Sequence, residues 1–228
     1  MKYIVIGLGN FGLALAQKLT KLGSEVIGID NSLLKVNAVK EKISHAICMD
    51  ATDEFTMSGL PFKDTDVVII AIGEDTGANI MATAMVKKLH PHRIISRAIT
   101  PVHETILEAM DVQTIIHPEE ETAERWAKKL SLKGMVESFE LSINYSIVEI
   151  AIPDNLVGKT IEEVGFRNNY NLVCVSIIKK IADTNFFGKV KRINQVQGVV
   201  TTDTVLESGE ILVIYGANAD IRKFIKEN

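Results

Sequence analysis

Three glycines have the spacing of a phosphate-binding loop. Gly7, Gly9 and Gly12 form the pattern GxGxxG directly after an apolar run. In such a loop the first glycine permits a tight turn, the second lets a phosphate approach the backbone, and the third lets a helix pack close to a strand. Amides at the start of that helix bind phosphate with help from the helix dipole. Because a predicted strand precedes the motif and a predicted helix follows it, we predict that these glycines, with Asn10 and Phe11, form a phosphate site and do not merely turn the chain.

A carboxylate ends the next apolar run. Asp30 stands 18 residues after Gly12, where an acidic side chain accepts hydrogen bonds from both ribose hydroxyls and repels a 2′-phosphate. NADP is therefore disfavoured, and NAD(H), ADP and ATP remain open. Asn31, the next residue, is a second candidate contact. The alternative for Asp30 is an N-cap of the helix that begins near Ser32, a role compatible with ribose binding.

Further polar residues follow the later predicted strands, at positions where ligands bind in open parallel sheets. Asp50 is placed to reach an adenine amino group, and Arg97 is placed to bind phosphate. For Asp50 the alternative is helix capping, as it is for Asp75, and for Arg97 it is a solvated position. The candidate contacts at these strand ends are Asp50, Ala51, Thr52, Ile72, Gly73 and Arg97.

The elements that must position these residues are short apolar runs that alternate with amphipathic stretches. The runs are rich in Val and Ile and lack strict alternation, as expected of parallel strands with helices on both faces. This order predicts an α/β fold, with a Rossmann-type doubly wound parallel sheet over residues 1–117. The predicted strands are 2–6, 25–29, 45–49, 66–72, 93–96 and 112–116.

A helix and a smaller domain follow. The stretch 118–132 begins with three glutamates and closes with Lys128 and Lys129, followed by Lys133, a charge order that complements the helix dipole. We expect residues 118–134 to form a bridging helix and linker, and residues 135–228 to form a small α+β domain. Its predicted strands are 146–152, 172–179 and 210–215, its predicted helices are 160–164 and 220–226, and one predicted turn is 183–185.

Composition limits the class of protein. The chain has 228 residues and a formal net charge of -4, so we expect no basic face for nucleic acid. No apolar run has the roughly 18–20 residues that span a bilayer, and the first residues lack the length and cleavage site of a signal peptide. Cys48 and Cys174 are isolated, and we expect two buried, reduced thiols. These features predict a cytoplasmic protein.

The patterns that indicate catalysis are missing. A dehydrogenase needs a proton donor or acceptor beside the nicotinamide, but the second domain contains no histidine and no histidine of the first has an obvious carboxylate partner. No nucleophile elbow, cysteine pair, HExxH motif or P-loop is present. We therefore predict that the protein is not an enzyme, with an NAD-dependent oxidoreductase as the alternative. The histidines are His45, His90, His92, His103 and His117.

A Rossmann domain, one bridging helix and a small domain without catalytic groups form an unusual order, which resembles the regulator-of-potassium-conductance (RCK) family. Within that family the chain is similar to the cytosolic regulatory subunits of Ktr/Trk-type potassium-uptake systems. The resemblance covers essentially the whole chain, and its motifs are most specific in the first domain. It rests on residues 6–12 (IGLGNFG), 25–30 (EVIGID), 50–52 (DAT), 71–73 (AIG), 115–119 (IIHPE), 145–150 (YSIVEI), 158–161 (GKTI) and 208–216 (SGEILVIYG).

The resemblance implies a nucleotide sensor. The first domain would bind ATP, ADP or NAD(H), with the glycine loop on phosphate and Asp30 on ribose. Dimers would assemble into an octameric ring under a membrane potassium translocator, at the inner face of the membrane, and ATP and ADP would favour ring shapes that gate ion flow differently. Glu119 matches an acidic position that binds a cation, such as Mg²⁺, between paired nucleotide sites in some relatives. The second domain would dimerise, and in some relatives this module binds cyclic di-AMP.

Two positions depart from the family pattern. Asn10 stands where Ktr relatives often carry an arginine on the terminal phosphate, and an amide cannot form the charge-assisted bonds that separate ATP from ADP. Arg167 resembles a cyclic di-AMP contact, but Val173 stands where an asparagine is expected. A sensor subunit of a different transporter, built from the same modules, is a further alternative.

Overall fold

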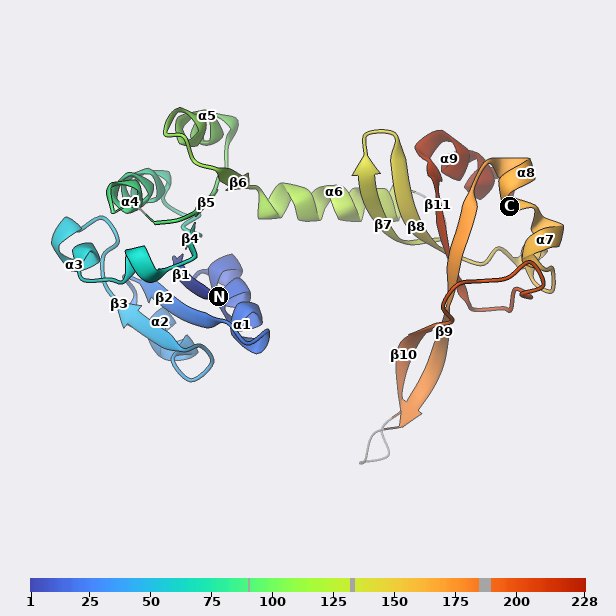
Figure 1. Ribbon diagram of the computed structural model, residues 1–228, viewed down its shortest axis with the longest axis horizontal. Coiled ribbons are helices and arrows are strands. Elements are labelled where there is room, and N and C mark those ends of the chain that lie inside the picture. Colours follow the sequence, from blue (N-terminus) through green and yellow to red (C-terminus); the bar gives the residue numbers. More distant parts are fainter. Residues whose placement is uncertain (90, 132–133, 185–189) are drawn as a thin grey trace. The chain divides into compact units, whose positions relative to one another are not determined.

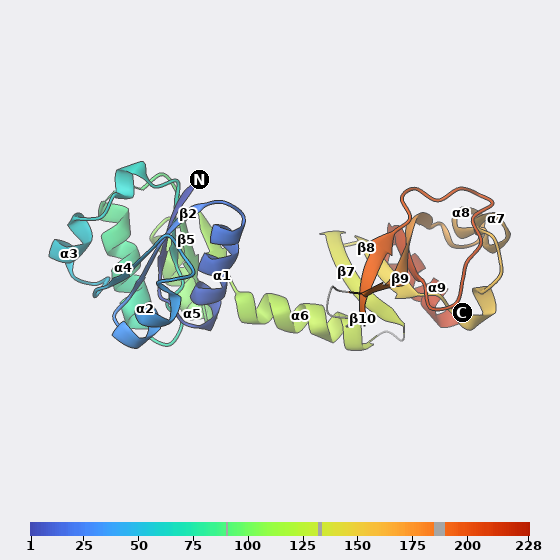
Figure 2. The ribbon, with the colours of Figure 1, turned by 90° about the horizontal axis from the view of Figure 1, so that it is seen from below.

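The computed structural model describes residues 1–89, 91–131, 134–184 and 190–228 (Figures 1 and 2). These residues form two compact units, Met1–Glu120 and Glu121–Asn228. Helix α6, Pro118–Ser131, contains the point of division in its first turn. None of the helices in the described ranges combines the length and the apolar composition needed to cross a bilayer.

The first unit is built on a six-stranded sheet of order β3-β2-β1-β4-β5-β6, in which all neighbouring strands are parallel. The predicted Rossmann-type α/β fold is confirmed. The strand order reverses between β1 and β4, and ligands bind outside the carboxyl ends of the strands at such a point. The elements are β1 (Lys2–Ile6), α1 (Asn10–Lys21), β2 (Glu25–Asp30), α2 (Leu33–Val39), β3 (His45–Cys48), α3 (Glu54–Ser58), the short 3₁₀ helix η1 (Phe62–Asp64), β4 (Val67–Ile70), α4 (Thr76–Lys88), β5 (Ile94–Arg97), α5 (Pro101–Ala109) and β6 (Thr114–Ile116).

Apolar side chains are buried on both faces of this sheet, which is why the central strands β1 and β4 are mostly apolar without alternation. In β1, Ile4 and Ile6 belong to one apolar cluster, and Val5 belongs to a second cluster on the opposite face. In β4, Val68 and Val67 divide between the same two clusters. Burial of each large aliphatic side chain contributes roughly 1.5–3 kcal/mol, so these two cores hold the strand ends in place.

The second unit contains a five-stranded antiparallel sheet of order β10-β9-β11-β8-β7, so the predicted α+β class is confirmed. Helices α7, α8 and α9 lie together beside the sheet, where the rings of Phe166 and Phe224 are 5.5 Å apart (Figures 1 and 2). Strands β9 and β10 form a hairpin that extends beyond the rest of this unit (Figure 1). The elements are β7 (Met135–Ser142), β8 (Tyr145–Ala151), the 3₁₀ helix η2 (Asp154–Leu156), α7 (Ile161–Val164), α8 (Phe166–Tyr170), β9 (Val173–Thr184), β10 (Val190–Val196), β11 (Ile211–Ala217) and α9 (Asn218–Glu227).

The second half of α6 is fastened to strand β7. Arg125 donates to both carboxylate oxygens of Glu137, with 2.8 Å between Nε and Oε1, and this guanidinium lowers the pKa of Glu137. Lys128 forms an ion pair with Glu140 on the same strand. These contacts explain why the helix belongs to the second unit from Glu121 onward.

Three elements of the second unit are not predicted by the sequence pattern. Strands β7 and β10 are the two edges of the sheet, and the last four residues of β7 are exposed, so the apolar alternation that marks a half-buried strand is weak there. Helix α8 follows directly on α7 through Gly165, whose φ of +64° permits the change of direction. The predicted turn at 183–185 is wrong for its first two residues, because β9 continues through Thr184 in its pairing with β10; Asn185 lies outside the described residues.

The prediction of two buried thiols is wrong for Cys48. This cysteine is exposed because it ends β3, the edge strand of the first sheet. Cys174 is half-buried, and burial raises its pKa to about 12. A thiol with that pKa stays protonated and unreactive at neutral pH.

Candidate functional site

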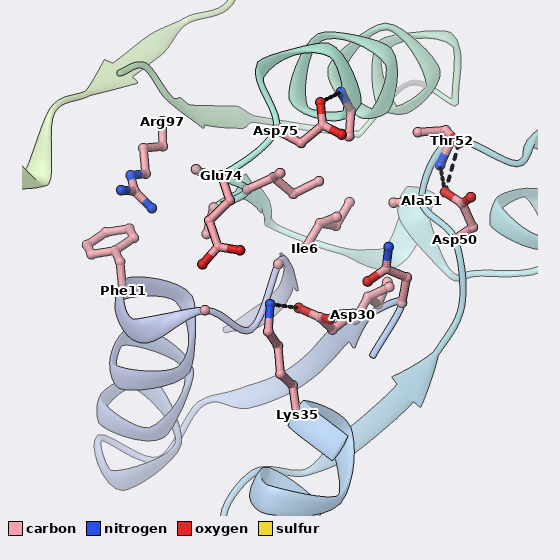
Figure 3. A pocket seen from close by; sticks show the side chains of 18 of the residues that line it. Ile6, Phe11, Asp30, Lys35, Asp50, Ala51, Thr52, Glu74, Asp75 and Arg97 are labelled. Atoms are coloured by element: carbon pink, nitrogen blue, oxygen red, sulfur yellow. Dashed lines mark hydrogen bonds and ion pairs between the residues drawn. The ribbon is translucent and has the colours of Figure 1, made fainter. Parts of the chain in front are cut away.

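A pocket of about 280 Å³ lies at the carboxyl ends of the strands of the first unit, where the strand order reverses (Figure 3). The loops after β1 and β4 and the ends of β2, β3 and β5 contribute to its walls. The lining residues are Ile6, Gly7, Gly9, Asn10, Phe11, Ile29, Asp30, Asn31, Lys35, Met49, Asp50, Ala51, Thr52, Ala71, Ile72, Gly73, Glu74, Asp75, Ala78, Arg97 and Glu119.

Each glycine of the loop has a separate steric role. Gly7 has φ of +95°, and a Cβ atom there would lie 2.8 Å from the backbone nitrogen of Ile72. A Cβ on Gly12 would overlap the carbonyl oxygen of Gly7, so only glycine lets α1 begin this close to β1. A Cβ on Gly9 would meet no described atom within 4 Å, because this residue faces the open pocket.

The start of α1 faces the pocket without a capping side chain. Gly9 is the N-cap residue, and the first turn of the helix, all of which is described, contains no acidic residue. The first backbone N–H groups of a helix have no partner within the helix, and together with the dipole they favour an anion. This end of the pocket therefore has the geometry of a phosphate site.

The carboxylate of Asp30 holds the glycine loop in place. This carboxylate is buried, with 7% of the residue exposed, and accepts hydrogen bonds from the amides of Leu8 (2.8 Å) and Ser32 (2.9 Å). Lys35, on the next helix, lies 3.6 Å from the same carboxylate (Figure 3). Ser32, not Asp30, is the N-cap of α2, so the capping alternative for Asp30 is wrong.

The acidic residues after β3 and β4 have different local roles. Asp50 accepts hydrogen bonds from the amide and hydroxyl of Thr52, at 2.9 and 2.8 Å, and both lower its pKa. The cap of α3 is Asp53, so the capping alternative for Asp50 is also wrong. Asp75 does cap α4, by accepting the amide of Ala78 at 2.9 Å, which confirms the capping interpretation for that residue. Glu74 points into the pocket (Figure 3).

Arg97 reaches into the opposite end of the pocket from the end of β5. Its side chain is largely buried and forms an ion pair with Glu119 at the start of α6. The guanidinium lies against Gly73, where any Cβ atom would overlap it. The absence of a side chain at Gly73 thus makes the seat for Arg97, a role that the sequence pattern does not reveal.

A buried polar network holds this end of the pocket, and sequence reasoning misses it. The amide nitrogen of Asn79 donates to the carbonyl oxygens of Ile72 (2.9 Å) and Arg97 (3.1 Å). Its amide oxygen accepts from Ser96 and lies 3.1 Å from Nε2 of His103. Because the oxygen of Asn79 is an acceptor, the neutral ring of His103 carries its proton on Nε2. The network joins the ends of β4 and β5 through one side chain.

The pocket brings together nearly all the residues predicted for it. Every candidate contact lines it except Gly12, which packs against Gly7 behind the pocket wall, and Glu119 lines it as well. The part of the chain that the structure describes contains no group of three or more His, Cys, Asp or Glu side chains able to hold a metal ion; the cation at Glu119 stays a prediction. The lining residues that sequence reasoning missed are Ile6, Ile29, Lys35, Met49, Ala71 and Ala78; Glu74 and Asp75 follow the fourth predicted strand, where the sequence already places ligand contacts.

Lys35 is the missed residue with a usable signal, because it stands in the first turns of the helix that follows Asp30. The histidine prediction needs one correction: Nε2 of His117 lies 3.2 Å from a carboxylate oxygen of Glu104. These two residues come from different elements, so their proximity is not visible in the sequence. His90 lies outside the described residues.

Comparison with known proteins identifies related sequences over the whole chain. The TrkA-N domain family matches residues 3–118. The Ktr system potassium uptake protein C of Bacillus subtilis (strain 168) is 32% identical, with 99% of this chain and 96% of that protein aligned. The Ktr system potassium uptake protein A of the same organism is 29% identical, again over 99% of this chain and 96% of the relative.

A solved structure shares the fold at low sequence identity. The structure described as a GsuK channel bound to NAD superposes with a TM-score of 0.63 and 18% identity. The match covers 98% of this chain and 39% of that longer chain, so this chain spans well under half of it. At this identity the likeness concerns the fold of the chain.

The first prediction separates the tightest glycine position of the loop from the most open one. Gly12→Ala adds a Cβ onto the carbonyl of Gly7, so we expect the free energy of unfolding to fall by about 1–3 kcal/mol, although Gly→Ala inside a helix ordinarily gains about 1 kcal/mol. Gly9→Ala enters open space at φ of −66°, and we expect a change of less than about 1 kcal/mol. Urea titration of both variants measures the difference. Equal stability of the two variants would contradict the assigned packing.

The second prediction concerns His103, of which 1% is exposed. Burial, and then the charge of His117, lower its pKa below the ordinary value of 6.5, and Nδ1 has no hydrogen-bond partner among the described residues. The unfolded chain therefore binds this proton more readily, so its stabilising contribution is present above pH 6.5 and is lost as the pH falls through the folded-state pKa. We expect His103→Gln to lose less stability than the wild type between pH 7 and pH 5.

Chemical unfolding at a series of pH values measures this dependence. His92→Gln, at an exposed position on the same unit, is the matched control. If the free energy of unfolding of His103→Gln depends on pH as steeply as that of the wild type, protonation of His103 does not cause the loss of stability at low pH.

Proposed function

This chain belongs to the TrkA-N family and has full-length Ktr-type potassium uptake proteins as relatives, and on that premise we propose that it is a nucleotide-sensing regulatory subunit of a membrane potassium-uptake system. The proposal assigns nucleotide binding to residues 1–117, connection to residues 118–134 and regulation to residues 135–228. The two Ktr relatives align over nearly their full length, which supports a shared role in potassium uptake.

One observation carries the nucleotide-binding part of the proposal. The uncapped start of α1, the open face of Gly9 and the carboxylate of Asp30 lie on one pocket, in the order that a diphosphate and a ribose would need. Beyond Asp30 the wall contains Met49 and Ala51, which offer apolar surface to a purine. Asp30 disfavours a 2′-phosphate by charge repulsion.

The charges of the pocket bear on the choice of nucleotide. Among the described residues of the lining, the basic ones are Lys35 and Arg97, and each already pairs with an acid. The acidic ones are Asp30, Asp50, Glu74, Asp75 and Glu119. We therefore propose that NAD(H) or ADP binds without a metal, and that ATP binds with a cation such as Mg²⁺ beside Glu119, because a triphosphate brings more negative charge to an acidic wall.

The proposed partners are a membrane potassium translocator and further copies of this chain. In this proposal the subunits form dimers and a ring, in the octameric form that the family resemblance implies, and the ring lies at the cytoplasmic face of the membrane. The nucleotide changes the shape of the ring without being consumed, so the protein is a regulator and not an enzyme. A ligand shifts such an equilibrium only by its difference in affinity for the two shapes, typically about 1–3 kcal/mol per site.

The experiment that tests nucleotide binding is calorimetry on the nucleotide-stripped full chain. We expect ADP, NAD, NADH and ATP to bind, with ATP helped by magnesium, and cyclic di-AMP is included as a separate ligand for the second unit. Gly9→Ala should weaken binding at least about tenfold, because the added methyl group stands where the phosphate meets the backbone. Gly59→Ala, at a position outside the pocket with ordinary contacts, is the control and should bind as the wild type does.

Three results would contradict parts of the proposal. If the chain binds none of the purine nucleotides, the proposed role as a nucleotide sensor is wrong. Steady oxidation or reduction of bound NAD(H) with a simple carbonyl or alcohol substrate would favour an oxidoreductase instead. Small-angle scattering in ATP and in ADP tests the change of shape, and identical profiles would remove the proposed mechanism of regulation.

A further inference from the structure

Arg97 lies in a seat that leaves part of its guanidinium unused. The side chain is 16% exposed and runs over Gly73, where the missing Cβ gives it room. Its Nε is buried, and among the described residues it has no hydrogen-bond partner. A buried N–H donor without a partner is costly, and a guanidinium has five donors in a fixed planar arrangement. The seat therefore leaves one donor of Arg97 unsatisfied, and Arg97 belongs to the pocket lining.

The present partner of Arg97 is a carboxylate that is easily displaced. Glu119 forms the ion pair with Arg97, but its side chain is 65% exposed. An exposed carboxylate recovers its hydration when it leaves a guanidinium, so such a pair contributes little free energy. Both residues line the same pocket as the glycine loop, so a ligand bound at the loop lies in the pocket that Arg97 also lines.

We propose that Arg97 exchanges Glu119 for the terminal phosphate of the bound nucleotide and thereby makes affinity depend on the number of phosphates. The inference rests on the proposed function, since it takes the ligand to be a nucleotide on the glycine loop. A guanidinium binds a phosphate through paired, charge-assisted hydrogen bonds, and the gain grows with the negative charge of the phosphate chain. Glu119 acts as a competitor that the ligand must displace.

The exchange has a consequence for the chain beyond the pocket. Glu119 is the second residue of α6, and α6 continues into the second unit, where Arg125 fastens it to β7. When phosphate takes Arg97, the first turn of α6 loses its ion pair to the end of β5. The number of phosphates on the ligand thus determines whether the start of α6 keeps its ion pair to Arg97.

The test measures the affinities of AMP, ADP and ATP by calorimetry for the wild type, Glu119→Gln and Arg97→Gln, in EDTA and in magnesium. In EDTA we expect Glu119→Gln to raise the affinity for ADP and ATP about two- to fivefold, and that for AMP less, because Arg97 is freed from an exposed pair. Arg97→Gln should make the affinities for the three ligands more nearly equal. Glu120→Gln removes the same charge from the next residue, which is outside the pocket lining, and should match the wild type.

Contrary outcomes are distinguishable. If the wild type binds the nucleotides but Glu119→Gln leaves the affinities unchanged, the exchange is wrong while the proposed function stands. If Glu119→Gln weakens the binding of ADP or ATP in EDTA, Glu119 supports the ligand directly and the exchange is again wrong. If the wild type binds none of the three, the proposed function itself fails. Unfolding curves of each variant show whether a loss of binding comes from a loss of folding.

Discussion

The hydrogen bond from the Leu8 amide to the buried carboxylate of Asp30 is the interaction on which the pocket depends. Leu8 stands between the first two glycines of the loop, so this bond fixes the path of the chain out of β1. The other oxygen of the same carboxylate accepts the amide of Ser32 and fixes the path out of β2. A buried carboxylate without such donors would be strongly destabilising. Without the carboxylate, in turn, the glycine loop would lose the hydrogen bond that holds it. The open backbone at Gly9 and the start of α1 follow from the position of that loop.

A second buried polar side chain, Asn79, does the corresponding work on the other half of the sheet. It holds the carbonyl groups that end β4 and β5, next to Gly73 and beneath Arg97. The loops of the two halves of the sheet meet where Gly7 passes Ile72, so close that Gly7 has no room for a Cβ atom. The pocket therefore lies between two buried side chains that hold backbone groups in place. Asp30 accepts hydrogen bonds from backbone amides, and Asn79 donates hydrogen bonds to backbone carbonyl groups. The side chains that remain open to a ligand, such as Glu74 and Arg97, are carried on this frame.

The part of the site that could be predicted from sequence is the part that is local in the chain. Gly7, Gly9 and Gly12 and the carboxylate of Asp30 have fixed spacings because one strand-loop-helix unit and the next strand require them. The seat of Arg97 on Gly73 and its pair with Glu119 join residues more than twenty positions apart. The hydrogen bonds of Asn79 to Ile72 and His103 join it to residues 7 and 24 positions away. For the fold, the buried parallel strands carry a strong apolar signal, whereas the edge strands β7 and β10 owe their formation to their neighbours' free hydrogen-bonding groups.

Asp50, at the pocket wall, is poorly suited to proton transfer at neutral pH. A general acid or base works best with a pKa near the working pH, and enzymes obtain this by burial or by pairing like charges. The hydrogen bonds from Thr52 move the pKa of Asp50 away from neutrality, which keeps a fixed negative charge at the pocket wall. The imidazole of His103, whose pKa is lowered, is turned into the core and is held by Asn79. In the exchange proposed above, the ligand replaces Glu119 as the partner of Arg97, and the lost ion pair is one that joins the start of α6 to the end of β5.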